Sequence, residues 1–409
     1  MRLLRLRGGG PRRLLGTVAV LALASSALSA CDAAPGDAQT DGAGTTPQAG
    51  QEAAQEAGQP RDVVLRSNVA KGAQGVPVDT LLELSAEGAE LERVVVTSPQ
   101  GRLPGRSTDG GAWRATERLE PGTTYAVEVR VGAGDESQVR QRTFRTVDLS
   151  LAQQTYASVA PLDGETVGVG MPVVVGFDLP VTDRAAVERQ MQVTATPRQA
   201  GTWHWISDTE VHYRPREYWK AGTEVSVDLD INGVDAGGGI YGQESRQVAF
   251  TVGEAHVYRV DARSHTMKVF SDGDLLRTIP ITTGKAGFTT RSGTKVVMEK
   301  HDTKRMDSET VGIGGSEAYD IADVQYAMRL TNSGEFIHAA PWSVGSQGSA
   351  NVSHGCTGLS TENAGWLYDM TRRGDVVEYT GTDRPMTLDN GYGDWNASWG
   401  AYRKGSALG

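Results

Sequence analysis

The residues best suited to do chemistry lie in two short segments of the C-terminal third of the chain. Residues 353–356 read Ser-His-Gly-Cys, and residues 337–342 read Ile-His-Ala-Ala-Pro-Trp. A thiol is a poor nucleophile until it loses its proton, and histidine is the usual base beside a catalytic cysteine. Backbone N–H groups in a tight, glycine-containing turn can hold a developing oxyanion. The two segments therefore predict Cys356 as a nucleophile served by a histidine.

Two histidines are candidates for that base. His354 stands two residues before Cys356 and would point the same way only in a strand, so we expect it to support the loop. His338 comes from a separate segment and can approach the sulfur from another direction. A buried, inert cysteine is the usual alternative for a lone thiol. The polar turn around Cys356 argues against that alternative.

These segments resemble the signature of the L,D-transpeptidases, whose catalytic domain is of the YkuD type. The resemblance extends to strands at 256–283, a Gly-Lys segment at 284–285, a Gly-Glu-Phe-Ile-His approach at 334–338 and a tail with Trp395 and Trp399. The whole plan of the chain is similar in particular to the actinobacterial, mycobacterial-type members. The resemblance covers nearly all of the chain that follows residue 30.

The resemblance implies a reaction on peptidoglycan stem peptides. Cys356 would attack the carbonyl of the third residue, a diaminopimelate, in a tetrapeptide donor stem. D-Ala would leave and a thioester would remain on the sulfur. The side-chain amine of a diaminopimelate on an acceptor stem would then resolve it, giving a 3→3 cross-link. No cofactor and no metal are implied.

The resemblance also assigns roles around the nucleophile. His338 would be the general base, oriented by the backbone carbonyl of Ala339, where the family often has Ser. The backbone N–H groups of His354, Gly355 and Cys356 would form the oxyanion hole, with Ser353 in the same loop. The implied substrate contacts are a lid tyrosine, placed at Tyr319, together with Ser333, Gly334, Trp342 and Gly358.

One position departs from the family pattern. The second residue after the cysteine is usually Asn, and here it is Gly358. Losing one positioning hydrogen bond costs about 1–3 kcal/mol, which would slow an enzyme without silencing it. We therefore expect weaker substrate positioning and an intact nucleophile.

The segment 254–380 must supply the elements that position these residues. Short β-type runs at 257–261, 268–270 and 276–282 are joined by polar turns such as 271–274. The spacing of apolar side chains predicts one helix from Ser360 to Arg373, ended by Gly374. Residues 381–409 carry Trp395 and Trp399 and are expected to fold back as an apolar clasp on the catalytic domain.

Two units of about 100 residues precede the catalytic segment. Residues 62–148 and 149–253 each show alternating strands and a Pro-Gly or Ala-Gly turn leading into a strand. Tyr125, at such a strand start, is similar to the tyrosine corner of Ig-type sandwiches. We therefore predict a mainly β protein: two tandem Ig-like β-sandwiches, then a β-rich catalytic domain with one or two short helices. Three tryptophans of the second unit have two interpretations, sandwich core or a carbohydrate-stacking platform, and the core is favoured: Trp203, Trp205 and Trp219.

The N-terminus predicts the location of the protein. Residues 1–30 have five arginines, no acid and an apolar run too short for a lasting membrane span. They end in Leu-Ser-Ala before Cys31, which resembles a bacterial lipobox. Lipidation of Cys31 would hold the protein on the outer face of the plasma membrane, at the cell wall. Residues 31–61 lack the apolar side chains for a core and predict a disordered tether.

Composition excludes several classes of protein. With 40 basic and 50 acidic residues the net charge is −10, which argues against a general nucleic-acid binder. Two cysteines cannot form a disulfide scaffold or a four-cysteine zinc site. We expect a monomer whose partners are stem peptides and, through the lipid, the membrane.

Two other functions remain open on sequence alone. The same thioester resolved by water or by a D-amino acid would give an L,D-carboxypeptidase or exchange enzyme. A catalytic domain that has decayed at Gly358 would leave a wall-binding lipoprotein. The presence of Cys356, His338, Ser353 and Gly355 favours the transpeptidase.

Overall fold

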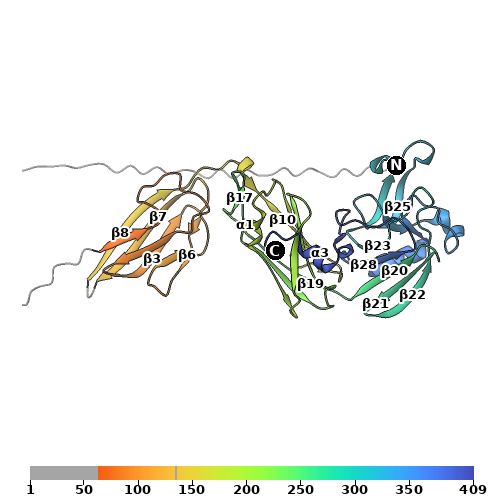
Figure 1. Cartoon of the computed structure of the whole chain (residues 1–409), viewed down its shortest axis with the longest axis horizontal. Coiled ribbons are helices and arrows are strands. Elements are labelled where there is room, and N and C mark those ends of the chain that lie inside the picture. The colour runs from red at the N-terminus through yellow and green to blue at the C-terminus, as the bar shows by residue number, and fades with distance from the viewer. Residues whose placement is uncertain (1–62, 134–135) are drawn as a thin grey trace, which may run out of the picture. The chain divides into compact units, whose positions relative to one another are not determined.

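Period-2 alternation of apolar and polar side chains gives this chain its fold. The computed structural model describes residues 63–133 and 136–409 of the 409-residue chain. There, two β-sandwiches precede a third, β-rich domain, so the predicted fold class is confirmed (Figure 1). Within the described residues, none of the helices has both the length and the apolar character that crossing a bilayer requires. The predicted signal segment, Cys31 and the tether lie outside the described residues.

The first sandwich is built from two four-stranded sheets, ordered β1-β2-β6-β5 and β4-β3-β7-β8. Its strands are β1 (Val64–Ser67), β2 (Glu83–Glu87), β3 (Glu90–Ser98), β4 (Gly101–Arg102), β5 (Gly105–Ser107), β6 (Trp113–Ala115), β7 (Thr124–Ala133) and β8 (Glu136–Arg145). The Tyr125 hydroxyl accepts a hydrogen bond from the Glu120 N–H at 2.8 Å. Its ring stacks on Phe144, with the centroids 5.2 Å apart. The tyrosine therefore ties the turn to the core, as a tyrosine corner does.

The second sandwich combines sheets ordered β10-β12-β15-β14 and β11-β19-β16-β13 with a small sheet β17-β18-β9. Its elements are η1 (Leu151–Gln153), β9 (Gln154–Thr155), β10 (Ala157–Ala160), β11 (Thr166–Val167), β12 (Val173–Phe177), α1 (Arg184–Glu188), β13 (Met191–Thr196), β14 (Gly201–Trp205), β15 (Glu210–Pro215), β16 (Glu224–Leu229), β17 (Asp235–Gly237), β18 (Ile240–Gly242) and β19 (Arg246–Val252).

The three tryptophans of this sandwich are core residues. Trp203, Trp205 and Trp219 are all buried within one apolar cluster. A buried indole N–H needs an acceptor, and each has one. The Trp219 N–H donates to the Met171 carbonyl at 2.8 Å, for example. A carbohydrate platform would require exposed ring faces, so the core interpretation is the one the structure supports.

The third domain contains a five-stranded sheet, β22-β21-β20-β28-β23, and a four-stranded sheet, β24-β25-β26-β27. Its elements are β20 (His256–Asp261), β21 (Thr266–Ser271), β22 (Asp274–Pro280), β23 (Gly293–Val296), β24 (Glu299–Asp307), η2 (Ser308–Val311), η3 (Gly315–Glu317), β25 (Asp320–Arg329), β26 (Phe336–Ala339), η4 (Pro341–Ser346), β27 (Thr357–Leu359), α2 (Thr361–Met370) and β28 (Val376–Thr380).

Helix α2 holds the strands that carry the site. Its N-cap is Ser360, whose hydroxyl accepts from the Asn363 N–H. It ends at Met370, three residues before the predicted end, because Thr371 has extended backbone angles. The buried Leu367 and the strand residue Ile337 belong to one core cluster. This packing fixes β26 against its parallel neighbour β27, with His338 opposite Gly358.

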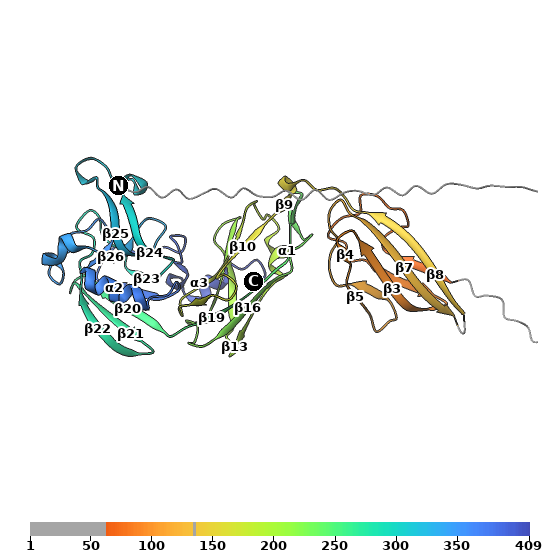
Figure 2. The same ribbon diagram turned by 180° about the vertical axis from the view of Figure 1, so that it is seen from behind.

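The C-terminal extension differs from its prediction in the surface that it covers. Besides η5 (Asp394–Asn396), which contacts β23, it forms α3 (Trp399–Arg403). Both views show α3 beside the second sandwich (Figures 1 and 2). The Arg214 guanidinium carbon of that sandwich lies 4.6, 5.4 and 4.2 Å from the ring centroids of Trp395, Trp399 and Tyr402. The extension thus packs on both the catalytic domain and the sandwich, because the cation gathers its aromatic rings.

A buried ion pair strengthens this attachment. His212 Nδ1 lies 3.0 Å from Asp394 Oδ1, and His212 Nε2 lies 3.0 Å from Glu210 Oε1. Burial by itself lowers the pKa of His212, but the two carboxylates outweigh it and raise that pKa to about 9. The histidine is therefore charged at neutral pH.

The raised pKa of His212 predicts a loss of stability at alkaline pH. Its contribution is complete below pH 6.5 and disappears as pH rises through about 9. We expect the Tm to fall between pH 7 and 9.5, by an amount corresponding to at most about 3 kcal/mol. In the His212→Gln/Asp394→Asn variant the fall should be smaller. Equal Tm profiles for the two proteins in thermal scans would contradict the assignment.

Candidate active site

The thiol of Cys356 lies at the end of a loop, directly before β27. Only 9% of the residue is exposed, and Sγ faces the Gly334 carbonyl oxygen at 3.6 Å. Burial raises the pKa of Cys356 to about 11. The sulfur is therefore protonated at neutral pH, and a reaction there needs a base to remove that proton.

His338 is suited to be that base. Its Nδ1–H donates to the Ala339 carbonyl at 2.8 Å, which leaves the lone pair on Nε2. Burial lowers the pKa of His338, so the ring is neutral at pH 7. His338 and Cys356 line the same pocket. The structure thus brings together the two residues that the sequence singled out, with the ring in the tautomer that can accept a proton.

The loop at residues 353–356 is held by its own hydrogen bonds. The Ser353 hydroxyl donates to the Cys356 carbonyl at 2.6 Å and accepts from the Gly355 N–H at 3.1 Å. Thr290 Oγ1 donates to the Gly355 carbonyl at 2.8 Å. The φ of +122° at Gly355 is one that residues with a side chain rarely adopt. Because the Gly355 N–H is engaged by Ser353, an oxyanion would have to compete for it.

His354 is oriented away from a role as base. Its Nε2–H donates to Glu317 Oε2 at 2.6 Å, and Lys285 Nζ lies 2.6 Å from the same oxygen. Its ring packs beside Phe288 and Tyr319, at centroid distances of 4.7 and 5.1 Å. Glu317 gives no local signal in the sequence, because it lies 37 residues before His354.

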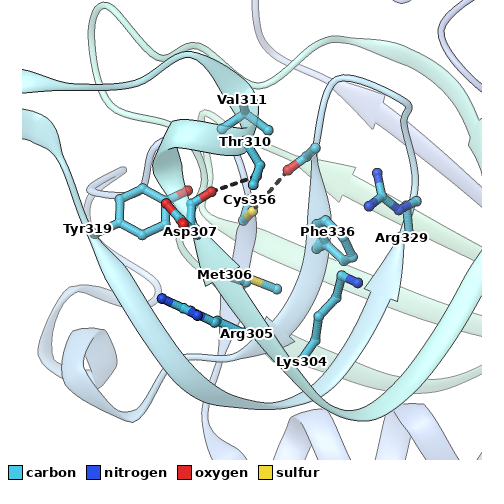
Figure 3. A pocket seen from close by; sticks show the side chains of 11 residues that line it. Lys304, Arg305, Met306, Asp307, Thr310, Val311, Tyr319, Arg329, Phe336 and Cys356 are labelled. Carbon is cyan, nitrogen blue, oxygen red and sulfur yellow. Dashed lines mark hydrogen bonds between the residues drawn. The ribbon is translucent and has the colours of Figure 1, made fainter.

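Cys356 lies between two pockets. The histidine pocket has a volume of about 270 Å³ and contains His338, Trp342, Ser343, His354 and Gly358 in its lining. The basic pocket has a volume of about 390 Å³ and includes Lys304, Arg305, Asp307, Arg329, Gly334 and Phe336. Met306, Tyr319 and Cys356 line both pockets. Figure 3 shows the Cys356 sulfur facing the basic pocket, between Tyr319 and Phe336.

A lid formed by residues 308–319 joins β24 to β25 and covers part of the site. It carries Tyr319, whose pKa burial raises to about 12. Val311 of the lid lies over Gly334: a Cβ on that glycine, whose φ is +91°, would lie 2.5 Å from Val311 Cγ1. The lid therefore contacts the backbone segment that faces the sulfur.

The predicted substrate contacts are distributed unevenly. Tyr319, Gly334 and Trp342 line the pockets, and Trp342 is 58% exposed. Ser333 lines neither pocket; its N–H donates to Asn390 Oδ1 at 2.9 Å. The sequence did not predict that the basic side chains of β24 and β25 line the site. They share one pocket because the two strands pair, and the pairing of strands is not visible in a local sequence pattern.

Gly358 occupies the position where the family pattern has Asn. A Cβ there would lie 2.9 Å from both Ala340 Cβ and Thr282 Cγ2. Such distances require the neighbours to move. Ala340 and Thr282 therefore fill the space that an Asn side chain would need, and the local packing requires glycine at position 358.

We therefore predict that Gly358→Asn disturbs the site. Pushing Ala340 and Thr282 away from β27 should lower the free energy of unfolding by about 1–3 kcal/mol and slow alkylation of Cys356. Gly345→Asn is the matched control, because a Cβ at Gly345 meets nothing within 4 Å. Thermal unfolding and iodoacetamide labelling measure both effects. A Gly358→Asn protein as stable and reactive as the control would show that the site is looser than described.

Across 63–133 and 136–409, no group of three or more His, Cys, Asp or Glu side chains is placed to hold a metal ion.

Comparisons with known proteins agree with this architecture. A bacterial Ig domain model matches residues 73–235, and the YkuD model, an L,D-transpeptidase catalytic domain, matches residues 255–378. L,D-transpeptidase 2 of Mycobacterium tuberculosis is 37% identical over 348 residues, which cover 84% of this chain and 85% of that protein. L,D-transpeptidase 1 of the same species is 40% identical over 227 residues, covering 55% of this chain and 84% of that protein.

A solved structure of LD transpeptidase LdtMt1 in complex with imipenem is also similar. It is 40% identical, covers 56% of this chain and 99% of that chain, and superimposes with a TM-score of 0.49. The matched catalytic segment in the family comparison includes both His338 and Cys356.

Proposed function

Because this chain belongs to the L,D-transpeptidase family, we propose that it forms 3→3 cross-links between peptidoglycan stem peptides through a thioester on Cys356. The observation that carries the proposal is the position of Cys356 between two pockets, with His338 in one of them. A transpeptidase must bring two peptides to one sulfur, and two pockets that share that sulfur meet this need.

The first half-reaction would acylate the cysteine. His338 Nε2 takes the Sγ proton while Sγ attacks the carbonyl carbon of the third residue, a diaminopimelate, in the donor tetrapeptide. The backbone N–H groups of His354 and Cys356 would stabilise the oxyanion, and that of Gly355 would join them by leaving the Ser353 hydroxyl. When the C–N bond breaks, the imidazolium returns the proton to the departing amine. D-Ala leaves, and the acyl group stays on sulfur as a thioester.

The second half-reaction would transfer the acyl group. The side-chain amine of a diaminopimelate on an acceptor stem attacks the thioester carbonyl, and His338 accepts a proton from that nitrogen. The C–S bond breaks, and the sulfur recovers a proton from the imidazolium. Stem peptides carry carboxylates, and Lys304, Arg305 and Arg329 give the basic pocket a charge suited to them.

Purified muropeptides test the proposal. Incubation with a tetrapeptide muropeptide should give a dimer whose mass shows the loss of one D-Ala, and Cys356→Ala should give none. Only shortened tripeptide would favour the carboxypeptidase instead. Unchanged muropeptide with folded protein would favour a wall-binding protein without activity.

We also propose that the protein is anchored by a lipid on Cys31, at the outer face of the plasma membrane. The proposal is supported by the Leu-Ser-Ala-Cys sequence that ends the N-terminal apolar segment. In detergent phase separation, the wild-type protein should enter the detergent phase and Cys31→Ala the aqueous phase. Wild-type protein in the aqueous phase would contradict the anchor.

A further inference from the structure

A buried cluster of charged side chains lies beneath the nucleophile. Lys295 of β23 is fully buried and Glu335 is 4% exposed. Lys295 Nζ lies 2.5 Å from Glu335 Oε2, and Arg291 NH1 lies 2.9 Å from Glu335 Oε1. The backbone N–H of Arg291 also donates to Oε1, at 3.1 Å. Glu335 is therefore held by three donors inside the domain.

The free energy needed to bury such a cluster makes it a poor source of fold stability. Taking charges out of water costs several kcal/mol for each ion, and apolar side chains of similar volume often serve stability as well or better. The catalytic mechanism described above does not use these three residues. Their contacts lead to Cys356 by two routes.

The cluster reaches the nucleophile through the backbone on one side. Glu335 stands between Gly334, whose carbonyl faces Sγ at 3.6 Å, and Phe336, whose backbone N–H donates to the same sulfur. Fixing the Glu335 side chain therefore fixes both backbone groups that contact Sγ.

It reaches the nucleophile by a second route through Tyr379 of β28. Lys295 Nζ lies 3.7 Å from the centroid of the Tyr379 ring. The Tyr379 hydroxyl is 2.6 Å from Thr357 Oγ1, and Thr357 follows Cys356 in the chain. The lysine is thus linked to both backbone segments at the sulfur, to one through Glu335 and to the other through Tyr379.

The charges of the cluster also act on the sulfur. Besides burial, which raises the pKa of the thiol most, Glu335 raises that pKa and Lys295 lowers it. Arg329, which lies outside the cluster, also lowers it. The lysine thus offsets the effect of the carboxylate on the sulfur. Burial lowers the pKa of Lys295 to about 8, so the lysine is largely protonated at neutral pH. The other titratable groups around the sulfur are His338 and His354 beside it, Tyr319 on the lid and Tyr379 on β28. The basic pocket adds Lys304, Arg305, Asp307 and Arg329.

We propose that Lys295, Glu335 and Arg291 form a positioning device for Cys356, which fixes the backbone around Sγ and offsets the charge of Glu335 at the thiolate with cations. The proposal rests on Cys356 being the nucleophile of the proposed function. Lys295 and Arg291 are positioning residues, since they act through the backbone and through their charge.

Thiol alkylation at different pH values tests the device. The Cys31→Ala background leaves Cys356 as the single cysteine. In that full-length protein, the rate of iodoacetamide labelling follows the thiolate fraction. Lys295→Met should raise the pKa of the Cys356 thiol and so displace the rate–pH profile toward higher pH by about one pH unit. Labelling at pH 7 should then be about tenfold slower. Lys295→Arg keeps the charge and should restore most of the rate. The wild-type profile should bend near pH 8, where Lys295 loses its proton, and the Lys295→Arg profile should not.

A second variant protects the test against misfolding. Arg291 is 15% exposed at the edge of the cluster, and Arg291→Met should displace the profile in the same direction. The control is Arg259→Met, which breaks an exposed pair with Glu378 and should change nothing. If the Lys295→Met and Arg291→Met profiles superimpose on wild type, the proposal is wrong. Labelling needs no peptidoglycan, so a protein that makes no cross-link but shows the displaced profiles would refute the proposed function alone.

Discussion

Replacing Cys356 with Ala will abolish the covalent adduct that we expect this protein to form with a carbapenem. A thiolate attacks the strained β-lactam carbonyl and the ring C–N bond opens. No group leaves, so the protein gains the mass of the whole drug. Intact-mass measurement after incubation with imipenem should show one adduct on wild type and none on Cys356→Ala.

The chain provides its own control for this experiment. Cys31 is the other cysteine of the sequence, and Cys31→Ala should form the adduct as readily as wild type. Circular dichroism should show that Cys356→Ala is folded, because the change removes one sulfur atom at the boundary of two pockets. An adduct that persists on Cys356→Ala would show that another residue is the nucleophile.

Replacing His338 with Ala will slow the same acylation by about 10²–10⁴-fold at pH 7, the usual range for a lost general base. The raised pKa of Cys356, about 11, leaves almost no thiolate at neutral pH without the histidine. The residual rate of His338→Ala should therefore climb with pH toward 11. On the acidic side, the wild-type rate should decline only where His338 becomes protonated, because burial lowers the pKa of His338 and keeps it neutral above that range.

Stopped-flow fluorescence or timed mass spectra can follow both rates. His301→Ala is a suitable control, since His301 is a histidine of β24 paired with the exposed Glu299. It should acylate like wild type. If His338→Ala lost no more than a fewfold in rate, another group would have to be the base.

Local sequence predicted the parts of this site that depend on neighbours in the chain. Ser353, Gly355 and Cys356 form one turn, and their mutual hydrogen bonds involve residues two or three positions apart. The carbonyl that orients His338 belongs to the next residue, Ala339. Such relationships survive in a linear pattern. The fold class was equally accessible, because period-2 alternation and turn residues are local.

Contacts between distant segments could not be derived in this way. Glu335 belongs to the Gly-Glu-Phe-Ile-His run, and an acidic residue directly before a buried strand is unusual enough to indicate a buried partner. That partner, Lys295, lies 40 residues earlier in the chain. The aromatic residues of the C-terminal extension predicted that it would cover a surface. Which surface depended on Arg214, whose side chain donates to the Ala397 carbonyl 183 residues later. The sequence predicts that Gly358 loses the hydrogen bond of the usual Asn side chain. In the structure, Thr282 and Ala340 fill the space that a side chain at Gly358 would occupy.

The C-terminal extension also sets an order of events when the protein is made. The Trp395 N–H donates to the Gly170 carbonyl across 225 residues, and the Ala407 N–H donates to Glu188 across 219. Domains generally fold in the order in which they leave the ribosome. The second sandwich, however, acquires these partners only when the last residues have been synthesised. A chain interrupted near its end would therefore leave Arg214, His212 and Glu188 without the partners that the C-terminal extension supplies. The second sandwich thus reaches its final set of contacts only when the polypeptide is complete.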